Sequence, residues 1–405
     1  MYKIGIIREG KVPPDARTPL TPEQCAFIMQ KFPVELVVEP SPVRSYTDAE
    51  YRAIGIPLAS DLNDCDILIG VKEVPADRLI PGKTYLFFSH TVKKQAQNRR
   101  LLQTILEKKI RLIDFEKLVD NQGDRLIAFG FYAGLVGAHN ALWTYGRRTG
   151  LFELPRMCDC HDYAKVKAAY AGLQLPPVRI VLTGGGRVAS GAVRNLHDIG
   201  IRQVSPRDFL THDYPYPVFT QLFAHDYVQH SQGPRIFDKT HFYTHGEEYI
   251  SAFAPYYQRA DIFINGIYYD RKAPVFFTLS EMAGPSFNLQ VIADVSCDIM
   301  PDSSVPSTIR SSSIADPVYG FNRFTAQECA PYSPDAVDVM AIDNLPSELP
   351  RDASEFFGKQ LIDNVLPELL HERDSIVIQR ATITENGRLT KLYEYLADYV
   401  AERVS

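Results

Sequence analysis

The stretch Arg179-Ile180-Val181-Leu182-Thr183-Gly184-Gly185-Gly186-Arg187-Val188-Ala189-Ser190-Gly191 decides the fold predicted for this 405-residue chain. Residues 179–183 form an apolar run that suits a buried strand, and residues 188–198 have helical character. An apolar segment at 201–204 predicts the next strand. Together the three segments make one mononucleotide-binding βαβ pattern, which predicts a doubly wound α/β fold.

The glycines of the turn have separate expected roles. Gly184 permits the tight turn, Gly186 lets the backbone approach a pyrophosphate, and Ala189 lets helix and strand pack closely. The turn therefore predicts a dinucleotide-binding site. The alternative is a glycine turn with a purely structural role.

The residue that contacts the adenosine ribose of a dinucleotide is expected about 20 positions after the first glycine, and an acidic residue there selects NAD. This chain has Val204-Ser205-Pro206-Arg207 at that place. A serine with an arginine nearby suits a 2′-phosphate, so Ser205 and Arg207 favour NADP over NAD. A ribose contact from Asp208 or from another loop is the alternative, which leaves both cofactors open.

Before this stretch, short apolar runs alternate with helix-like segments, and that alternation predicts a parallel sheet covered by helices. Thr21 has the position of an N-cap, with Pro22 at the first helical residue. The expected strands are 3–7, 35–38, 67–71, 85–89 and 111–114, and the expected helices are 22–30, 48–53 and 96–108.

Residues 129–148 contain no proline and are rich in small and aromatic residues, which predicts one long helix leaving the first unit. Residues 154–177 suit a connection into a second unit. Further strands are expected at 262–265 and 290–294, and further helices at 354–370 and 389–403.

Composition restricts the function classes. The net charge is −6, and the basic residues are dispersed, which argues against a nucleic-acid-binding surface. No apolar run approaches the roughly 18 residues of a membrane span. The first apolar run, Ile4–Ile7, lacks the flanks of a secretory signal, so we expect a cytoplasmic protein.

The six cysteines are few and scattered, and we expect them to be reduced. Cys158-Asp159-Cys160-His161 is the one cluster that resembles a set of metal ligands. It lacks a CxxC pair, and no second pair has zinc-site spacing. No metal site is therefore predicted.

Ionisable side chains follow several of the expected strands. Lys72 and Glu116 end two of them, and His90, whose ordinary pKa near 6.5 suits proton transfer, ends a third. Arg8 or Arg17 can bind a carboxylate through the planar guanidinium fork. The residues alone thus predict a dinucleotide oxidoreductase acting on a small anion, and the alternative for these side chains is surface ion pairing.

The order of the motifs is more specific than any one of them. The opening, Arg8–Lys11 and Arg17–Pro22, resembles that shared by alanine dehydrogenase, transhydrogenase and saccharopine dehydrogenase. Other segments are similar to lysine-forming saccharopine dehydrogenases and to the lysine-ketoglutarate reductase half of the bifunctional lysine-degrading enzyme. These segments are Gly70–Glu73, Phe88–Lys93, Phe129–Gly134, Ile264–Tyr268, Asp294–Asp298, Ile342–Pro346, Ala353–Phe357 and Ala381–Gly387.

The resemblance, which covers nearly the whole chain, implies an α/β protein of two Rossmann-like domains with a substrate cleft between them. Residues 1–133 with about 320–405 would form the substrate domain, and residues 134–319 the dinucleotide-binding domain. The implied reaction converts saccharopine, NAD(P)⁺ and water to L-lysine, 2-oxoglutarate and NAD(P)H, or runs in reverse. Expected partners are these small molecules and a second copy of the chain, with neither nucleic acid nor membrane.

Two other functions stay open. One is an alanine dehydrogenase or another amino-acid dehydrogenase that uses ammonia. The other, of a different class, is a non-catalytic protein that senses a dinucleotide or metabolite, because a fold does not by itself prove activity.

The resemblance also implies residue roles. Lys72 and His90 would be the acid/base pair, with His90 serving the carbonyl or water oxygen and Lys72 the amine, while Glu73 and Glu116 tune their charge. The residues implied for saccharopine are Arg17, Gln95, Arg125 and Phe129. Those implied for the cofactor, besides Ser205 and Arg207, are Gly184, Gly186, Arg187, Ile264, Asn265, Asp294, Val295 and Ser296.

Two departures from the family pattern stand out. The opening motif usually carries a glutamate where this chain has Asp15. Residues 211–249 resemble an insertion that the short fungal enzymes lack and that the reductase half contains. We expect this insertion to cover the cleft or to contact a second subunit.

Overall fold

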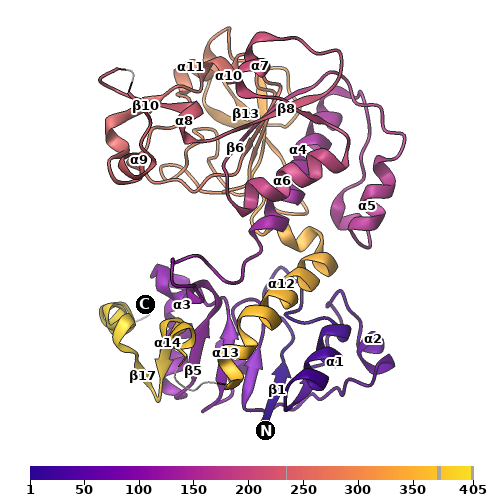
Figure 1. The fold of residues 1–405 in the computed structure, drawn as a ribbon, viewed down its shortest axis with the longest axis vertical. Coiled ribbons are helices and arrows are strands. Elements are labelled where there is room, and N and C mark those ends of the chain that lie inside the picture. The colour runs from indigo at the N-terminus through magenta and orange to yellow at the C-terminus, as the bar shows by residue number, and fades with distance from the viewer. Residues whose placement is uncertain (234, 372–374, 403–405) are drawn as a thin grey trace. The chain divides into compact units, whose positions relative to one another are not determined.

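The computed structural model describes residues 1–233, 235–371 and 375–402. The chain forms two compact units, the first from Met1–Phe129 with Pro350–Ser405 and the second from Gly130–Leu349. Each unit is a sheet with helices on both faces (Figure 1), which confirms the predicted α/β class.

The sheet of the first unit has the strand order β17-β16-β5-β4-β3-β1-β2. Strands from β5 to β2 pair in parallel, and β16 and β17 add antiparallel at one side. The strands are β1 (Tyr2–Ile6), β2 (Val34–Val38), β3 (Ile67–Ile69), β4 (Thr84–Phe87), β5 (Arg111–Asp114), β16 (Thr382–Glu385) and β17 (Arg388–Leu389).

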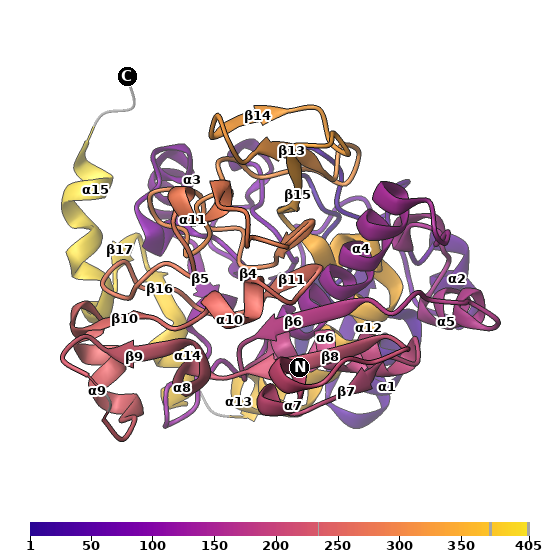
Figure 2. The same cartoon turned by 90° about the horizontal axis from the view of Figure 1, so that it is seen from above.

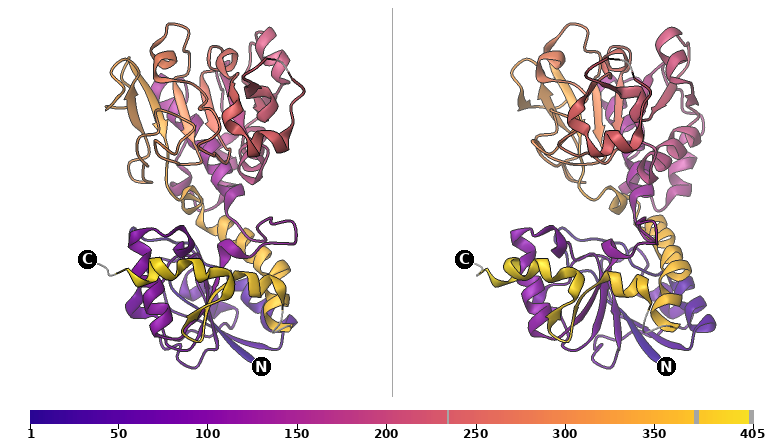
Figure 3. Two further views of the ribbon diagram at one scale, coloured as in Figure 1. Left: turned by 90° about the vertical axis from the view of Figure 1, so that its left-hand side faces the viewer. Right: turned by 60° about the vertical axis from the view of Figure 1, so that its left-hand side comes forward.

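Two apolar clusters bury the two faces of this sheet, and the ribbon in Figure 3 shows helices beside it. One face packs on α1 (Pro22–Lys31), α12 (Pro350–Asn364), α13 (Leu366–His371) and α14 (Ile376–Ala381). The other packs on α3 (Ala96–Glu107), η7 (Lys391–Leu396) and α15 (Ala397–Ala401). Short segments α2 (Asp48–Ala53), η1 (Ala76–Arg78), η2 (Thr91–Lys93) and η3 (Phe115–Lys117) connect the strands.

Helix α1 begins as the sequence predicts. The Thr21 hydroxyl accepts the backbone N–H of Gln24, the Gln24 side chain accepts the backbone N–H of Thr21, and Pro22 occupies the first turn. This reciprocal capping satisfies donors that a helix start would otherwise leave unpaired.

The sheet of the second unit has the order β14-β13-β15-β12-β11-β6-β8-β7. Strands from β15 to β7 are parallel, and β13 and β14 are antiparallel. The strands are β6 (Arg179–Thr183), β7 (Arg202–Gln203), β8 (Val218–Leu222), β11 (Ile262–Asn265), β12 (Val291–Asp294), β13 (Tyr319–Asn322), β14 (Gln327–Cys329) and β15 (Ala336–Met340). A separate antiparallel pair joins β9 (Val228–His230) and β10 (Tyr249–Ser251).

Helices again cover both faces of this sheet (Figure 2). One face packs on α4 (Gly130–Thr149), α5 (Tyr163–Tyr170) and α6 (Arg187–Asp198). The other packs on α7 (Pro206–Thr211), α10 (Ala254–Tyr257) and α11 (Leu279–Ala283). The remaining helical segments are α8 (Ala224–Tyr227), α9 (Lys239–Thr244), η4 (Met157–Asp159), η5 (Gly246–Glu248) and η6 (Leu345–Glu348).

The predicted domain boundaries need one large correction. Residues 320–349, expected with the first unit, belong to the second, because β15 extends its sheet beside β12 and β13 pairs on β15. Residues 130–133 also move to the second unit, since α4 begins at Gly130.

Other elements differ from expectation for local reasons. The helix predicted at 354–370 divides into α12 and α13 near Pro367, which has no N–H to continue the backbone ladder. Residue 403 of the closing helix predicted at 389–403 lies outside the described residues, and the rest of that range contains the end of β17, then η7 and α15. The connection at 154–177 contains α5, which the sequence analysis missed.

Helices α4 and α6 approach so closely that glycine is required at their contact. A Cβ placed on Gly134 would lie 1.7 Å from the Val188 carbonyl oxygen, and one on Gly191 would lie 1.8 Å from that of Phe131. No side chain fits at such distances. This contact fixes α6, and with it the glycine turn, against the long helix α4.

We predict that Gly134→Ala destabilises the second unit by about 1–3 kcal/mol, because overpacking forces the two backbones apart. The measurement is urea unfolding followed by circular dichroism. Gly130→Ala in the same helix is the control, since its Cβ would meet neighbouring side chains only at 3.5 Å and beyond. Equal stability of the two variants would contradict the proposed constraint.

Candidate active site

The ionisable residues predicted at strand ends gather at one edge of the first unit's sheet. Strands β1, β3, β4 and β5 are parallel neighbours, so their carboxyl ends lie at the same edge. Lys72 follows β3, His90 follows β4, and Glu116 follows β5. The parallel sheet therefore collects groups that are far apart in the sequence.

Glu73 and His90 form a directly hydrogen-bonded pair through Nδ1 of the imidazole. Burial acts to raise the pKa of Glu73, but the hydrogen bond and charge of His90 outweigh burial and lower that pKa to about 2. Glu73 is thus ionised and accepts the Nδ1–H, so Nε2 is the ring nitrogen that takes no part in this bond. His90 also has a left-handed backbone, with φ of 53°, a conformation that concentrates at functional sites.

Lys72 is partly buried, and its ammonium is destabilised. Burial first, and then the charges of Arg17 and Lys11, lower the pKa of Lys72 to about 8, although the charge of Glu73 opposes them. A lysine with this pKa is neutral in about a tenth of the molecules at pH 7, and in that form it can accept a proton from an ammonium group.

Glu9 holds the backbone that carries Lys72, a role that the sequence analysis missed. Its carboxylate accepts the N–H of Val71 at 2.7 Å and that of Lys72 at 2.9 Å. Burial raises the pKa of Glu9 to about 7, although these two N–H donors oppose the rise. The opening motif contained Glu9, but nothing in the sequence shows that it reaches the end of β3.

Arg17 is buried and forms a fork with Asp15. The guanidinium donates to the two carboxylate oxygens at 3.0 and 2.6 Å, and both residues are 2% exposed. Its charged plane lies 4.2 Å from the centre of the Phe129 ring. Asp15, which replaces the glutamate usual in this motif, therefore still makes a complete two-point ion pair.

Glu116 is a partly buried acid that pairs with two cations. It lies 2.7 Å from Arg125 and 3.5 Å from Lys93. Burial raises the pKa of Glu116, but Lys93 and Arg125 outweigh it, so the net shift is downward. Gln95 lies at the exposed start of α3, and its side-chain oxygen accepts hydrogen bonds from Gln97 and Asn98.

In the second unit the glycine turn has the geometry that a pyrophosphate requires. Gly184 has φ of +111°, and a Cβ there would lie 2.6 Å from the Gly266 carbonyl oxygen. At Gly186, the N-cap of α6, a Cβ would meet no described atom within 4 Å. Gln221 donates to the Gly184 carbonyl at 2.8 Å and holds the turn. The bare backbone and the start of α6 fit an anionic phosphate group.

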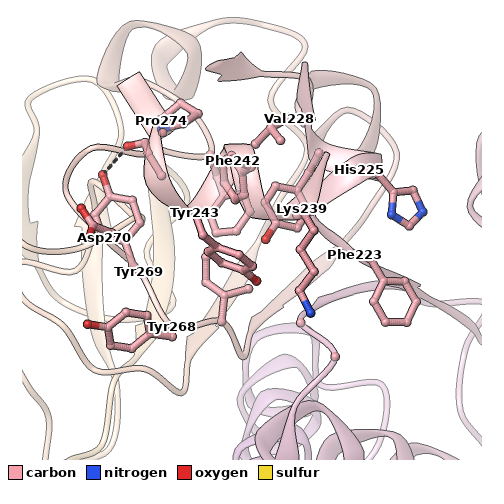
Figure 4. Close-up of a pocket in the computed structure, with 18 of the residues that line it drawn as sticks. Phe223, His225, Val228, Lys239, Phe242, Tyr243, Tyr268, Tyr269, Asp270 and Pro274 are labelled. Carbon is pink, nitrogen blue, oxygen red and sulfur yellow. Dashed lines mark hydrogen bonds between the residues drawn. The ribbon is translucent and has the colours of Figure 1, made fainter. Parts of the chain in front are cut away.

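A cavity of about 720 Å³ opens beside this turn (Figure 4). Its lining includes the three glycines of the turn, aromatic side chains and a few polar groups. The size, shape and composition suit a small organic ligand.

The position expected for the adenosine ribose needs a correction. Strand β8 lies between β6 and β7, so the strand beside the glycine turn is β8 rather than the strand that follows α6 in sequence. A groove of about 540 Å³ at this edge is lined by Ser205 together with Phe223, His225 and Asp226. Sequence spacing could not predict Phe223, His225 and Asp226, because a prediction from spacing assumes that consecutive strands in the sequence are neighbours in the sheet.

Ser205 and Arg207 have different surroundings. The Ser205 hydroxyl accepts the Asp208 N–H at 3.0 Å and caps α7. Arg207 is exposed in the first turn of α7 and does not line this groove in the described structure.

The other residues predicted for the cofactor are mainly structural supports. Asp294 is buried and accepts hydrogen bonds from Asn265, Ser296, Ser303 and Thr308. The Ile264 side chain is fully buried in the core beneath α4. The remaining predicted residues are Val295, which packs against Gly137, and Arg187, which is exposed at the start of α6.

Within residues 1–233, 235–371 and 375–402, no three His, Cys, Asp or Glu side chains gather in an arrangement that could hold a metal ion. In the same residues, none of the helices combines the length and apolarity needed to cross a bilayer.

The sequence of the chain is similar to those of known proteins. The family described as alanine dehydrogenase/PNT, N-terminal domain, matches residues 5–136. The NAD(+), L-lysine-forming saccharopine dehydrogenase of Emericella nidulans is 28% identical over 97% of this chain and 96% of its own length. The chain is thus similar over most of its length to lysine-forming saccharopine dehydrogenases. The predicted resemblance is thereby confirmed.

Longer homologues also match. The α-aminoadipic semialdehyde synthases of Arabidopsis thaliana and Rattus norvegicus are each 30% identical, over 97% and 94% of this chain. The chain spans 41% and 46% of their lengths, which is less than half of either protein.

Among solved structures, an L-alanine dehydrogenase aligns with a TM-score of 0.67 over 98% of this chain and all of its own. A transhydrogenase from Sinorhizobium meliloti aligns with a TM-score of 0.57 over 96% of this chain and 98% of its own. Both are 14% identical, so the likeness concerns the fold, and it confirms the predicted two-domain class.

The lowered pKa of Lys72 predicts how the free energy of unfolding changes with pH. Its pKa is about 8 in the folded protein against 10.5 in the unfolded chain, so the unfolded chain binds more protons between these pH values. The charged lysine therefore costs stability at pH 7, and this cost fades as the pH rises toward 10.5. We expect Lys72→Met to raise the free energy of unfolding at pH 7 by about 1–3 kcal/mol, with a smaller gain at pH 10.

Urea unfolding of both proteins at pH 7 and pH 10 measures this difference. Lys72→Arg keeps the positive charge and serves as the control, with no gain expected. A Lys72→Met variant less stable than the natural protein at pH 7 would contradict the unfavourable burial of the ammonium.

Proposed function

We propose that this protein is a lysine-forming saccharopine dehydrogenase, which converts saccharopine, NAD(P)⁺ and water to L-lysine, 2-oxoglutarate and NAD(P)H, or catalyses the reverse condensation. The observation that carries the proposal is the Glu73–His90 pair beside Lys72, whose pKa is lowered to about 8, at one sheet edge. Homology over nearly the whole chain to enzymes named for this reaction supports the choice of substrate.

The proposed roles follow from the state of each group. In the condensation direction Lys72, as the neutral amine, takes a proton from the ε-ammonium of the substrate lysine. When the His90 ring carries a proton on both nitrogens, Glu73 holds the Nδ1–H and the Nε2–H is given to the departing oxygen, which leaves the neutral imidazole. Protonated Lys72 is stabilised in turn by Glu73, which opposes the effect of burial on its pKa. When bound, the nicotinamide dinucleotide supplies or accepts the hydride.

The substrates carry several carboxylates, and fixed cations suit them. We propose that Arg17 and Arg125 bind these groups and that Gln95 and Phe129 complete the substrate site. Phe129 already lies against the Arg17 guanidinium. Asp15 and Glu116 pair with the two arginines, so their charges hold the guanidinium groups in place.

For the cofactor we propose NADP, with its phosphorylated ribose in the groove at Ser205. The Ser205 hydroxyl and the His225 imidazole line that groove, and Arg207 follows on the first turn of α7. Titration with NADPH and NADH tests this choice, and we expect a Kd for NADPH about tenfold lower, the effect of one charge-assisted hydrogen bond. Tighter binding of NADH would contradict it.

From the sequence alone, we propose that the protein is cytoplasmic and that it forms a homodimer. The remaining cofactor contacts are proposed at Gly184, Gly186, Arg187 and the strand ends after Ile264 and Asp294.

Lys72→Met and His90→Gln test the acid/base pair. Each substitution should lower kcat for lysine plus 2-oxoglutarate by about 100-fold or more, since a positioned acid or base contributes that much, while dinucleotide binding stays normal. Oxidation of NADPH and NADH, followed by absorbance, is the measurement. Lys359→Met, an exposed lysine in the same unit, is the control. Normal rates in both variants would refute the assignment.

The same assay with alternative substrates tests the reaction itself. Turnover with lysine plus 2-oxoglutarate, and none with pyruvate plus ammonia, is the expected result. Turnover with pyruvate plus ammonia alone would identify an alanine dehydrogenase. Cofactor binding without turnover on any amine and keto acid would indicate a sensor.

A further inference from the structure

The segment predicted as an insertion, residues 211–249, forms part of the wall of the cavity beside the glycine turn. Phe223, His225, Lys239 and Tyr243 of this segment line the same cavity as Gly184–Gly186 (Figure 4). Phe223 packs directly on the turn, because a Cβ on Gly185 would lie 2.8 Å from its ring. The insertion therefore meets the turn within the second unit.

Lys239 occupies a position that does not favour a cation. It is the first residue of α9, where Asp238 caps the helix by accepting the N–H groups of Thr240 and His241. The positive end of the helix dipole repels a lysine there. Its ammonium lies 5.9 Å from the centre of the Tyr243 ring, and in the described part of the chain it has no carboxylate partner in an ion pair.

The side chain of Lys239 nevertheless projects into the cavity. Figure 4 shows its ammonium extended on the side where Phe223 lies. Lys272 and His225 line the same cavity, whose acidic lining residue, Asp270, accepts the backbone N–H of Lys272 at 2.9 Å. The cavity thus has an excess of positive charge next to the start of α6, which also attracts anions.

We propose that Lys239 binds the pyrophosphate of the dinucleotide, so that the insertion supplies a cofactor ligand. This inference rests on the proposed function. The pyrophosphate is the group chosen, rather than the 2′-phosphate, because Lys239 shares a cavity with the glycine turn. The groove at Ser205 shares Phe223 and His225 with this cavity, but Lys239 is not among the residues that line the groove in the described structure.

Calorimetric titration of the full chain with NADH and NADPH tests the proposal without any need for turnover. Lys239→Met should raise the Kd for both dinucleotides about tenfold, the effect of one charge-assisted hydrogen bond, and Lys239→Arg should restore most of the affinity. Lys167→Met is the matched control, because Lys167 is also exposed in the second unit with its ammonium near a tyrosine ring. Its Kd values should equal those of the natural protein.

Each other outcome has a definite meaning. An unchanged Kd for Lys239→Met, or a loss confined to NADPH, would overturn the pyrophosphate assignment while leaving dinucleotide binding intact. If the natural protein bound neither dinucleotide, the proposed function itself would fail.

Discussion

The constraint on which the structure depends is parallel strand pairing, because parallel neighbours all end at the same edge of a sheet. In the first unit this pairing brings Lys72, His90 and Glu116 to one edge, although each follows a different strand. In the second unit it places the glycine turn beside the ends of β8 and β11. Both candidate sites are therefore consequences of strand order, and the helices that cover the sheets hold that order.

Charge burial distinguishes the site in the first unit from an ordinary surface. Burial lowers the pKa of Lys72 to about 8 and raises that of Glu9 to about 7, while the partnership with His90 brings that of Glu73 to about 2. Separate environments thus give neighbouring groups different protonation states near neutral pH, which proton transfer in two directions requires.

In the second unit, backbone rather than side-chain chemistry dominates the turn. Gly134 and Gly191 let α4 and α6 touch, and this contact sets where α6 begins. The turn itself exposes backbone groups that suit any pyrophosphate, so it cannot distinguish one dinucleotide from another. The segments that line the neighbouring cavities include Ser205, His225 and Lys239, and we propose that they supply discrimination and additional affinity.

The sequence by itself determined the α/β class, most strands, the glycine turn and the candidate acid/base residues. Local signals carry these features: apolar runs, the capping box at Thr21, and ionisable residues placed directly after strands. Tertiary structure alone decided that β8 lies beside β6, that residues 320–349 join the second unit, and that Glu9 supports the backbone of Lys72. Strand order and burial depend on contacts between residues distant in sequence, so no local pattern could encode them. For the same reason the sequence could not predict Lys239, because the cavity that it lines is formed by segments distant in sequence.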